Sequence, residues 1–149
     1  MLTAKIKEII RMALKEDIGQ GDITTDMLIE PGLKIKALIV AKEKGVIAGL
    51  AIAKEVFQAL DKNIIFQAKI KDAKIVKPNQ IVAEIKGKAK SILTAERTAL
   101  NFLTHLSGIA TLTKRFVDRA LPYGVNIFDT RKTIPGLRQL EKYAVRCGG

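Results

Sequence analysis

Residues 125–138 read Val-Asn-Ile-Phe-Asp-Thr-Arg-Lys-Thr-Ile-Pro-Gly-Leu-Arg, and this stretch decides the fold that we expect. Its first four residues, Val125-Asn-Ile-Phe128, are typical of a short buried β-strand. The polar residues Asp129-Thr-Arg-Lys132 follow, and from Pro135 onward the sequence has helical spacing, with proline near the start, where helices favour it. A buried strand that passes through a polar turn into a helix is typical of α/β enzymes, which place ligand groups at this turn.

The sequence upstream of this stretch predicts a mixed α+β module. Apolar residues between Ile6 and Leu14 recur at helical spacing, which predicts a helix from near Thr3 to about Gly19. Residues 20–26 are rich in turn formers and predict an irregular loop, in which we expect Asp22, Thr24 and Thr25 to act as caps. Further along, the patterns predict strands at 35–40, 64–70 and 81–85, a turn at 45–49, a helix at 50–60 and a turn at 77–80.

A long helical stretch follows at residues 91–121. We expect a break or kink at Ser107-Gly108, because serine can cap a second helix there. Leu100, Leu103, Leu106 and Ala110 form the stripe that we expect to be buried. Pro122-Tyr-Gly124 should end the helix, because proline cannot continue it.

The composition is that of a folded domain with a strongly basic balance. The chain has 149 residues, of which 48% are hydrophobic, and its formal net charge is +11. A positive field of this size attracts nucleic acid, acidic lipid or small polyanions, and an excess of lysine also accompanies solubility or growth at high temperature. Charge alone leaves these alternatives open.

Two classes of protein are disfavoured by the sequence. No apolar run approaches the ~20 residues of a membrane span, and the N-terminus lacks the pattern of a signal peptide, so we expect a cytoplasmic protein that binds no membrane. Cys147 is the only cysteine, which excludes an intramolecular disulfide and a zinc site built on several thiolates. We expect Cys147 to be an inert packing residue.

Several residues are candidates for a binding or catalytic role because of their side-chain type alone. Arg131 can grip a carboxylate or phosphate through a bidentate fork, and Lys132 supplies a point charge suited to phosphate, although both could also simply solvate a loop. Arg97 taken alone suggests an ion pair with a carboxylate close to it on its helix. His105, the only histidine, is expected to be a packing residue. Gly19-Gln-Gly21 lacks the preceding strand and following Lys-Ser/Thr of a phosphate loop.

The stretch Asp129-Thr-Arg-Lys-Thr-Ile-Pro-Gly-Leu-Arg-Gln-Leu-Glu-Lys-Tyr-Ala-Val145 resembles the signature of the quinolinate phosphoribosyltransferases. Three further motifs of that family occur in its order and at its approximate spacing. They are Glu16-Asp-Ile-Gly-Gln-Gly-Asp-Ile-Thr-Thr25, Glu96-Arg-Thr-Ala-Leu-Asn-Phe-Leu103 and His105-Leu-Ser-Gly-Ile-Ala-Thr111. The resemblance therefore spans the whole chain.

The resemblance implies a transfer of phosphoribosyl from phosphoribosyl pyrophosphate to quinolinate with decarboxylation, which yields nicotinate mononucleotide for NAD biosynthesis. It implies that Thr130, Arg131 and Lys132 bind the anionic groups of the substrates. It also implies a homodimer in which Arg97 reaches the active site of the partner subunit, and Mg²⁺ that accompanies phosphoribosyl pyrophosphate. No catalytic residue and no metal ligand is assigned.

The family fold implies an α+β domain, which we place at residues 1–109, followed by an α/β barrel that begins at residues 110–149. Such barrels run to ~250 residues, and this sequence carries one expected barrel strand. We therefore expect an incomplete form that has no appreciable turnover by itself.

Two alternatives remain. A paralogue of the same superfamily, one that uses nicotinate or one associated with molybdenum transport, is not fully excluded by the motifs. A basic nucleic-acid-binding module has only the net charge in its favour, because the sequence has no zinc-finger pattern, aromatic RNA platform or recognisable helix-turn-helix.

Overall fold

The structure of the protein is a computed structural model that describes residues 2–19, 21 and 27–149. Its helices and strands follow one another in a mixed α/β order that agrees with the α+β expectation for the first part of the chain. They are α1 (Ala4–Ile18), β1 (Lys34–Val40), β2 (Gly45–Val46), α3 (Leu50–Leu60), β3 (Ile65–Ala68), β4 (Ile75–Val76), β5 (Ile81–Lys88), α4 (Ala89–Ala120), the 3-10 helix η1 (Leu121–Tyr123) and α5 (Arg138–Gly148).

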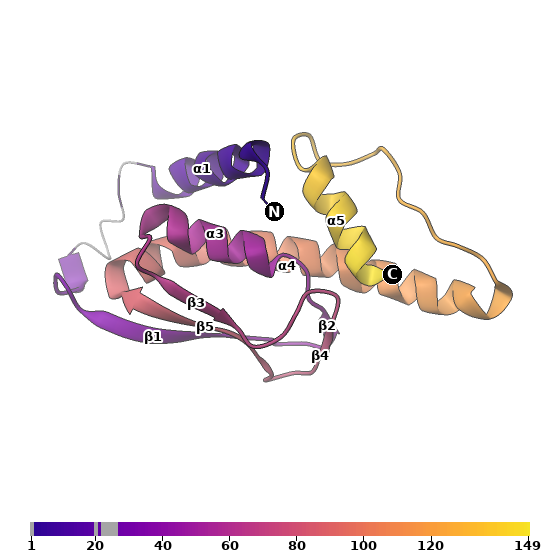
Figure 1. The fold of residues 1–149 in the computed structure, drawn as a ribbon, viewed down its shortest axis with the longest axis horizontal. Helices are drawn as coiled ribbons and strands as arrows, with labels where there is room; N and C mark the ends of the chain where they lie inside the picture. Colours follow the sequence, from indigo (N-terminus) through magenta and orange to yellow (C-terminus); the bar gives the residue numbers. More distant parts are fainter. Residues whose placement is uncertain (1, 20, 22–26) are drawn as a thin grey trace.

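The elements stack in layers around one long helix (Figure 1). Strands β1, β5 and β3 form an antiparallel sheet in that order, and β2 pairs with β4 in a separate two-stranded ribbon. Helices α3 and α4 cover the sheet, and α1 packs on both of them on the side away from it. The main core lies between these layers, and it takes in buried residues of α5 as well.

The predicted strands of the sheet and the turn at 77–80 are confirmed with small shifts of the strand ends. The turn predicted at 45–49 is wrong in its first two residues, because Gly45–Val46 form strand β2. Strand β1 pairs with β5 from Lys34 opposite Lys88 to Val40 opposite Ile81. The turn at 77–80 is closed by a hydrogen bond of 3.1 Å from the Gln80 amide to the Lys77 carbonyl, and Asn79 has φ +65°. Asparagine tolerates this left-handed conformation better than most residues, which explains its place after proline.

Helix α1 forms as its periodicity predicts. The Thr3 hydroxyl accepts a hydrogen bond of 3.3 Å from the Ile6 amide and so caps the first turn. Ile6, Ile10 and Leu14 are buried along one face. The loop predicted at 20–26, with its capping roles, lies outside the described residues except for Gly21.

Helix α4 corrects the expectation of a break at Ser107-Gly108, because it is helical without interruption from Ala89 to Ala120. The Ser107 hydroxyl accepts a hydrogen bond of 3.1 Å from the Ala48 amide, and the Thr111 hydroxyl accepts one of 2.8 Å from the Val46 amide. These two hydroxyls lie one turn apart on α4. They accept hydrogen bonds from backbone amides, as the carbonyl groups of a neighbouring strand would. Ser107 therefore satisfies the backbone of another segment and caps no helix.

Residues 125–128 are wrongly predicted as a buried strand. They form no strand in the structure, and Val125 and Phe128 are 57% and 83% exposed. A strand needs a neighbouring backbone to pair with, and none of the described strands pairs with this segment. The helix after it begins at Arg138, later than expected, because Gly136 has φ +85° in the preceding turn and cannot belong to a helix.

Helix α5 lies across α4 (Figure 1), with Leu140 and Ala144 buried in the main core. The crossing is so close at Gly148 that a Cβ atom there would lie 2.4 Å from the Ala110 carbonyl oxygen. Within the described residues, no helix combines the length and the apolar character that a membrane span requires.

Candidate functional site

The segment that carries Thr130, Arg131 and Lys132 is an exposed loop between η1 and α5. In Figure 1 this segment runs as a wide arc outside the rest of the molecule. The Thr130 hydroxyl accepts a hydrogen bond of 3.1 Å from the Lys132 amide, which closes a local turn around Arg131. The three predicted residues are therefore brought together by their own loop.

Side chains of α5 hold this loop along its length. Lys142 Nζ lies 2.7 Å from Asp129 Oδ1 at the start of the loop. Arg138 donates from Nε to the Thr133 hydroxyl at 3.2 Å and from Nη2 to the Arg131 carbonyl at 3.4 Å. Helix α5 thus holds in place the loop backbone that carries Arg131 and Lys132.

Arg97 lies on α4 with its side chain 75% exposed. Its Nη1 atom lies 3.3 Å from Asp17 Oδ1, near the end of α1, so the ion pair joins two helices and is not formed within α4. Arg97 lines a cavity of about 490 Å³ together with Asn101, His105 and Ile134. Thr130, Arg131 and Lys132 do not line this cavity. The structure therefore does not bring Arg97 and the loop cations into one pocket.

Two polar residues were not singled out by the sequence: Thr98, which lines this cavity, and Glu141, which contacts two residues that line it. Thr98, next to Arg97, is 3% exposed, and its hydroxyl has no hydrogen-bond partner among the described residues. Glu141 of α5 lies 3.1 Å from His105 Nε2 through Oε1, and its Oε2 accepts from the Ile134 amide at 3.3 Å. The expectation that His105 only packs is incomplete, because its ring contacts a carboxylate.

A second link joins α5 to the first part of the chain. The Tyr143 hydroxyl lies 2.5 Å from Asp72 Oδ2, and the Asp72 carboxylate also accepts from the amides of Gly49 and Leu50. Burial, together with the hydrogen bond and charge of Asp72, raises the pKa of Tyr143. Burial also raises the pKa of Cys147, which agrees with the expectation that this thiol is inert.

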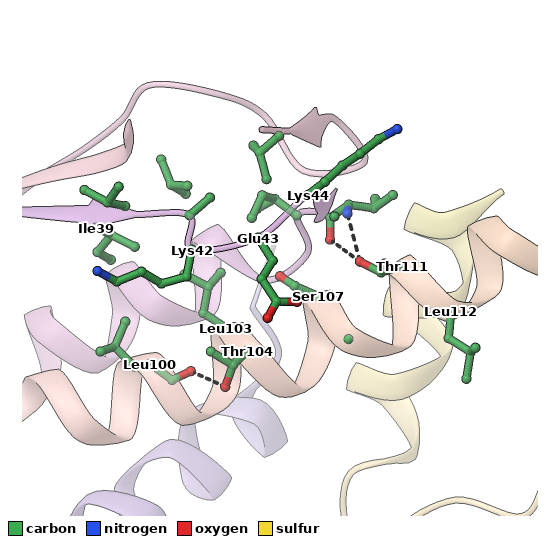
Figure 2. A pocket seen from close by; sticks show the side chains of 18 of the residues that line it. Ile39, Lys42, Glu43, Lys44, Leu100, Leu103, Thr104, Ser107, Thr111 and Leu112 are labelled. Atoms are coloured by element: carbon green, nitrogen blue, oxygen red, sulfur yellow. Dashed lines mark hydrogen bonds between the residues drawn. The ribbon is translucent and has the colours of Figure 1, made fainter. Parts of the chain in front are cut away.

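A second hollow, with mostly apolar walls, lies elsewhere, between α4 and the connection from β1 to β2 (Figure 2). It measures about 490 Å³, and Leu100 and Leu103 form part of its wall, with Lys42 and Lys44 on the opposite side. The Thr104 hydroxyl bonds back to the Leu100 carbonyl of its own helix. None of the predicted site residues lines this hollow.

A metal site is not formed by the part of the chain that the structure describes. No group of three or more His, Cys, Asp or Glu side chains there could hold a metal ion. The residues present therefore do not fit a metal held by the protein alone.

Family models match most of the chain. The model of the quinolinate phosphoribosyl transferase N-terminal domain matches residues 22–107, and that of the C-terminal domain matches residues 109–149. The junction between the two matches falls inside α4.

Curated relatives and solved structures agree with these matches. A probable carboxylating nicotinate-nucleotide pyrophosphorylase of Synechocystis is 49% identical over 91% of this chain and 46% of its own length. One of Bacillus subtilis is 43% identical over 97% of this chain and 50% of its own length. A nicotinate-nucleotide pyrophosphorylase structure from Francisella tularensis superposes with a TM-score of 0.94 at 42% identity, covering 100% of this chain and 52% of the other.

The chain thus spans about half the length of the curated relatives it matches. Both family models match in their order, and the fold superposes over the whole chain. The chain belongs to the quinolinate phosphoribosyltransferase family.

Proposed function

We propose that the chain takes part in phosphoribosyl transfer from phosphoribosyl pyrophosphate to quinolinate, which yields nicotinate mononucleotide, pyrophosphate and carbon dioxide for NAD biosynthesis. The names of its relatives support this reaction. We propose further that residues 1–109 form the α+β domain and that residues 110–149 begin the α/β barrel. The cytoplasmic location expected from the sequence stays a prediction.

The observation that carries the proposal is that two positively charged side chains on one loop form no ion pair with a carboxylate of the described residues. Arg131 and Lys132 are exposed, and neither side chain forms an ion pair with a carboxylate in the described part of the chain. Lys142, by contrast, is paired with Asp129. Such side chains are suited to binding a polyanionic substrate, because no ion pair within the protein must break when the substrate binds.

The proposed chemistry needs positive charge more than it needs a nucleophile from the protein. The ring nitrogen of quinolinate forms a bond to the anomeric carbon of the ribose while the bond from that carbon to pyrophosphate oxygen breaks. The resulting pyridinium accepts the electron pair released when the adjacent carboxylate leaves as carbon dioxide, and a proton then takes its place. Arg131 would hold a carboxylate through its fork, and Lys132 would neutralise phosphate.

Mg²⁺ belongs to this proposal as a companion of phosphoribosyl pyrophosphate. Magnesium is commonly bound through substrate phosphates with few protein ligands. The described residues offer no cluster of ligands for it. We therefore assign no residue of this chain to the metal and no step of the reaction to it.

We also propose that Arg97 acts across a homodimer. Its side chain is largely exposed, and its cavity does not include the loop cations. A symmetric dimer would place Arg97 of each copy near the loop of its partner if the two surfaces face each other across the axis.

The test joins residues 1–149 to the half of the Bacillus subtilis relative that this chain does not cover, and it measures formation of nicotinate mononucleotide. We expect activity with quinolinate and none with nicotinate, which lacks the second carboxylate. Arg131→Ala should lower kcat/KM about a hundredfold, because a bidentate charge-assisted contact contributes about 3 kcal/mol.

The matched control is Arg119→Ala, which removes an exposed arginine at the end of α4, away from the loop. It should leave kcat/KM within about twofold. Equal losses in both variants, or equal use of nicotinate, would contradict the assignment of Arg131. Tight binding of duplex DNA by the chain, with a steep salt dependence that quinolinate leaves unchanged, would favour the nucleic-acid alternative.

A further inference from the structure

The loop at residues 129–134 has no helix or strand of its own, so its position depends on side chains that reach it. Lys142 and Arg138 contact its aspartate, its hydroxyl and one of its carbonyls, and both belong to the helix that follows it. These contacts fix the loop to α5. Helix α5 packs on α4, the helix that carries Arg97, through Leu140, Ala144 and Gly148, but these residues lie outside the loop.

Glu141 adds a polar link between α4 and a residue of the loop itself. One of its carboxylate oxygens accepts the Ile134 amide at 3.3 Å, and the other lies 3.1 Å from His105 Nε2 on α4. The Glu141 side chain is 12% exposed, so a carboxylate largely removed from water is held between these two donors. A single side chain therefore joins the end of the loop to α4.

The contact lies on the same side of α4 as Arg97. His105 follows Arg97 by eight residues, which is about two helical turns and about 12 Å along the axis. Arg97, Asn101 and His105 line the same cavity as Ile134, at the end of the loop, and Leu137. His105 and Glu141 therefore lie between α4, which carries Arg97, and the loop that carries Thr130, Arg131 and Lys132.

We propose that His105 and Glu141 form a positioning pair that sets the loop of Thr130, Arg131 and Lys132 relative to α4. The proposal rests on the proposed function, in which this loop binds substrate anions. His105 touches no reacting atom in this proposal. It orients Glu141, and Glu141 orients the backbone at Ile134.

The test measures amide hydrogen exchange by NMR on the 149-residue chain without ligand. His105→Leu keeps an apolar side chain in place of the ring but removes the donor to Glu141. We expect exchange at Ile134 to become about tenfold faster, because Glu141 loses its second partner. His105→Gln keeps a donor at similar reach and should restore exchange to within about threefold of the native rate.

Two comparisons decide between positioning and packing. Thr104→Val changes the exposed residue next to His105 on α4, whose hydroxyl bonds only within α4, and it should leave Ile134 exchange unchanged. Equal acceleration by His105→Leu and His105→Gln would overturn the proposal, because packing loss would then explain both. Unchanged exchange in His105→Leu would overturn it as well.

A spectroscopic measurement on the unmodified chain covers the case in which His105→Leu does not fold. The ring-nitrogen spectrum of His105 should show a proton on Nε2, since this atom faces the Glu141 carboxylate. An unprotonated Nε2 would overturn the proposal. Neither measurement needs substrate, so failure of the positioning pair is distinguishable from failure of the proposed function, which the Arg131→Ala activity tests.

Discussion

At the scale of single residues, Asp72 shows how one carboxylate can join distant segments. Its two oxygens accept the amides of Gly49 and Leu50 at the start of α3, and one of them also contacts the Tyr143 hydroxyl of α5. Gly49 has φ +104°, and a Cβ there would lie 2.8 Å from Leu106 Cδ1, so glycine is required at this position. Asp72 therefore connects the beginning of α3 with the helix that holds the loop at residues 129–134.

The raised pKa of Tyr143 predicts a dependence of stability on pH. The folded state holds the phenol proton more tightly than the unfolded state, whose pKa stays near 10.0. The contribution of Tyr143 is therefore complete below pH 10 and is lost as pH rises beyond that value. The difference in free energy of unfolding between Tyr143 and Tyr143→Phe chains should shrink above pH 10.

Ultraviolet titration gives an independent check on the same residue. The chain has two tyrosines, and Tyr123 is 82% exposed, so Tyr123→Phe leaves Tyr143 as the only phenol at little structural cost. Its ionisation should occur above pH 10 in the native chain and return to about 10 in denaturant. A native midpoint at or below that of the denatured chain would show that Asp72 and burial do not protect the proton.

Ser107 predicts a cost for removing one hydroxyl. Ser107→Ala leaves the Ala48 amide, in a fully buried residue, without its acceptor. We expect the free energy of unfolding to fall by about 1–3 kcal/mol, measured by chemical denaturation. Thr104→Val is the control, and it should change stability by no more than about 0.5 kcal/mol, because the Thr104 hydroxyl bonds only to its own helix. Similar effects of both changes would contradict the strand-like role of Ser107.

At the scale of elements, α4 is the part of the molecule on which the others assemble. It contacts α1, α3, α5 and the strands β1, β2 and β5. Its face toward β2 carries the hydroxyls of Ser107 and Thr111, and its face toward α5 is close enough to require glycine at 148. A break in α4 would therefore disturb its contacts with several neighbouring elements at once.

Two glycine substitutions test the close crossing of α4 and α5. Gly148→Ala would press a methyl group against the Ala110 carbonyl and Thr113, and it should destabilise the chain by about 1–3 kcal/mol. Gly108→Ala adds the same methyl to α4 where nothing lies within 4 Å, and it should stabilise by about 0.5–1 kcal/mol. Thermal unfolding that shifts in the same direction for both would contradict the packing described for Gly148.

The elements that periodicity alone can identify are those that the sequence predicts best. Helix α1 and helix α3 each carry a clear apolar face, and both form where the pattern places them. The break at Ser107 and the strand at 125–128 are wrong for a shared reason. Whether serine caps a helix, or an apolar run becomes a strand, depends on the backbone that lies beside it, and local sequence does not contain that information.

At the scale of the whole molecule, the sequence predicts only those residues of the candidate site that belong to one contiguous motif. Thr130, Arg131 and Lys132 are adjacent in the sequence, so their proximity needs no knowledge of the fold. Glu141 and Asp72 were missed because each acts through a partner 36 or 71 residues away. A single sequence does not distinguish such a carboxylate from one that faces solvent.

The whole-molecule claim is that Arg97 of one copy and the loop of another complete each substrate site. Mixing tests this claim directly, again with the chain joined to the second half of the Bacillus subtilis relative. Arg97→Ala and Arg131→Ala proteins should each be nearly inactive alone. In a mixed dimer, one site would carry both changes and the other neither.

The decisive measurement is therefore the rate of nicotinate mononucleotide formation after equal amounts of the two variants are unfolded together and refolded. Random pairing should restore native residues to roughly one site in four, and the activity should rise to about a quarter of the unmodified rate. Activity that stays at the level of the separate variants would contradict the claim, because Arg97 would then act within its own chain or not at all.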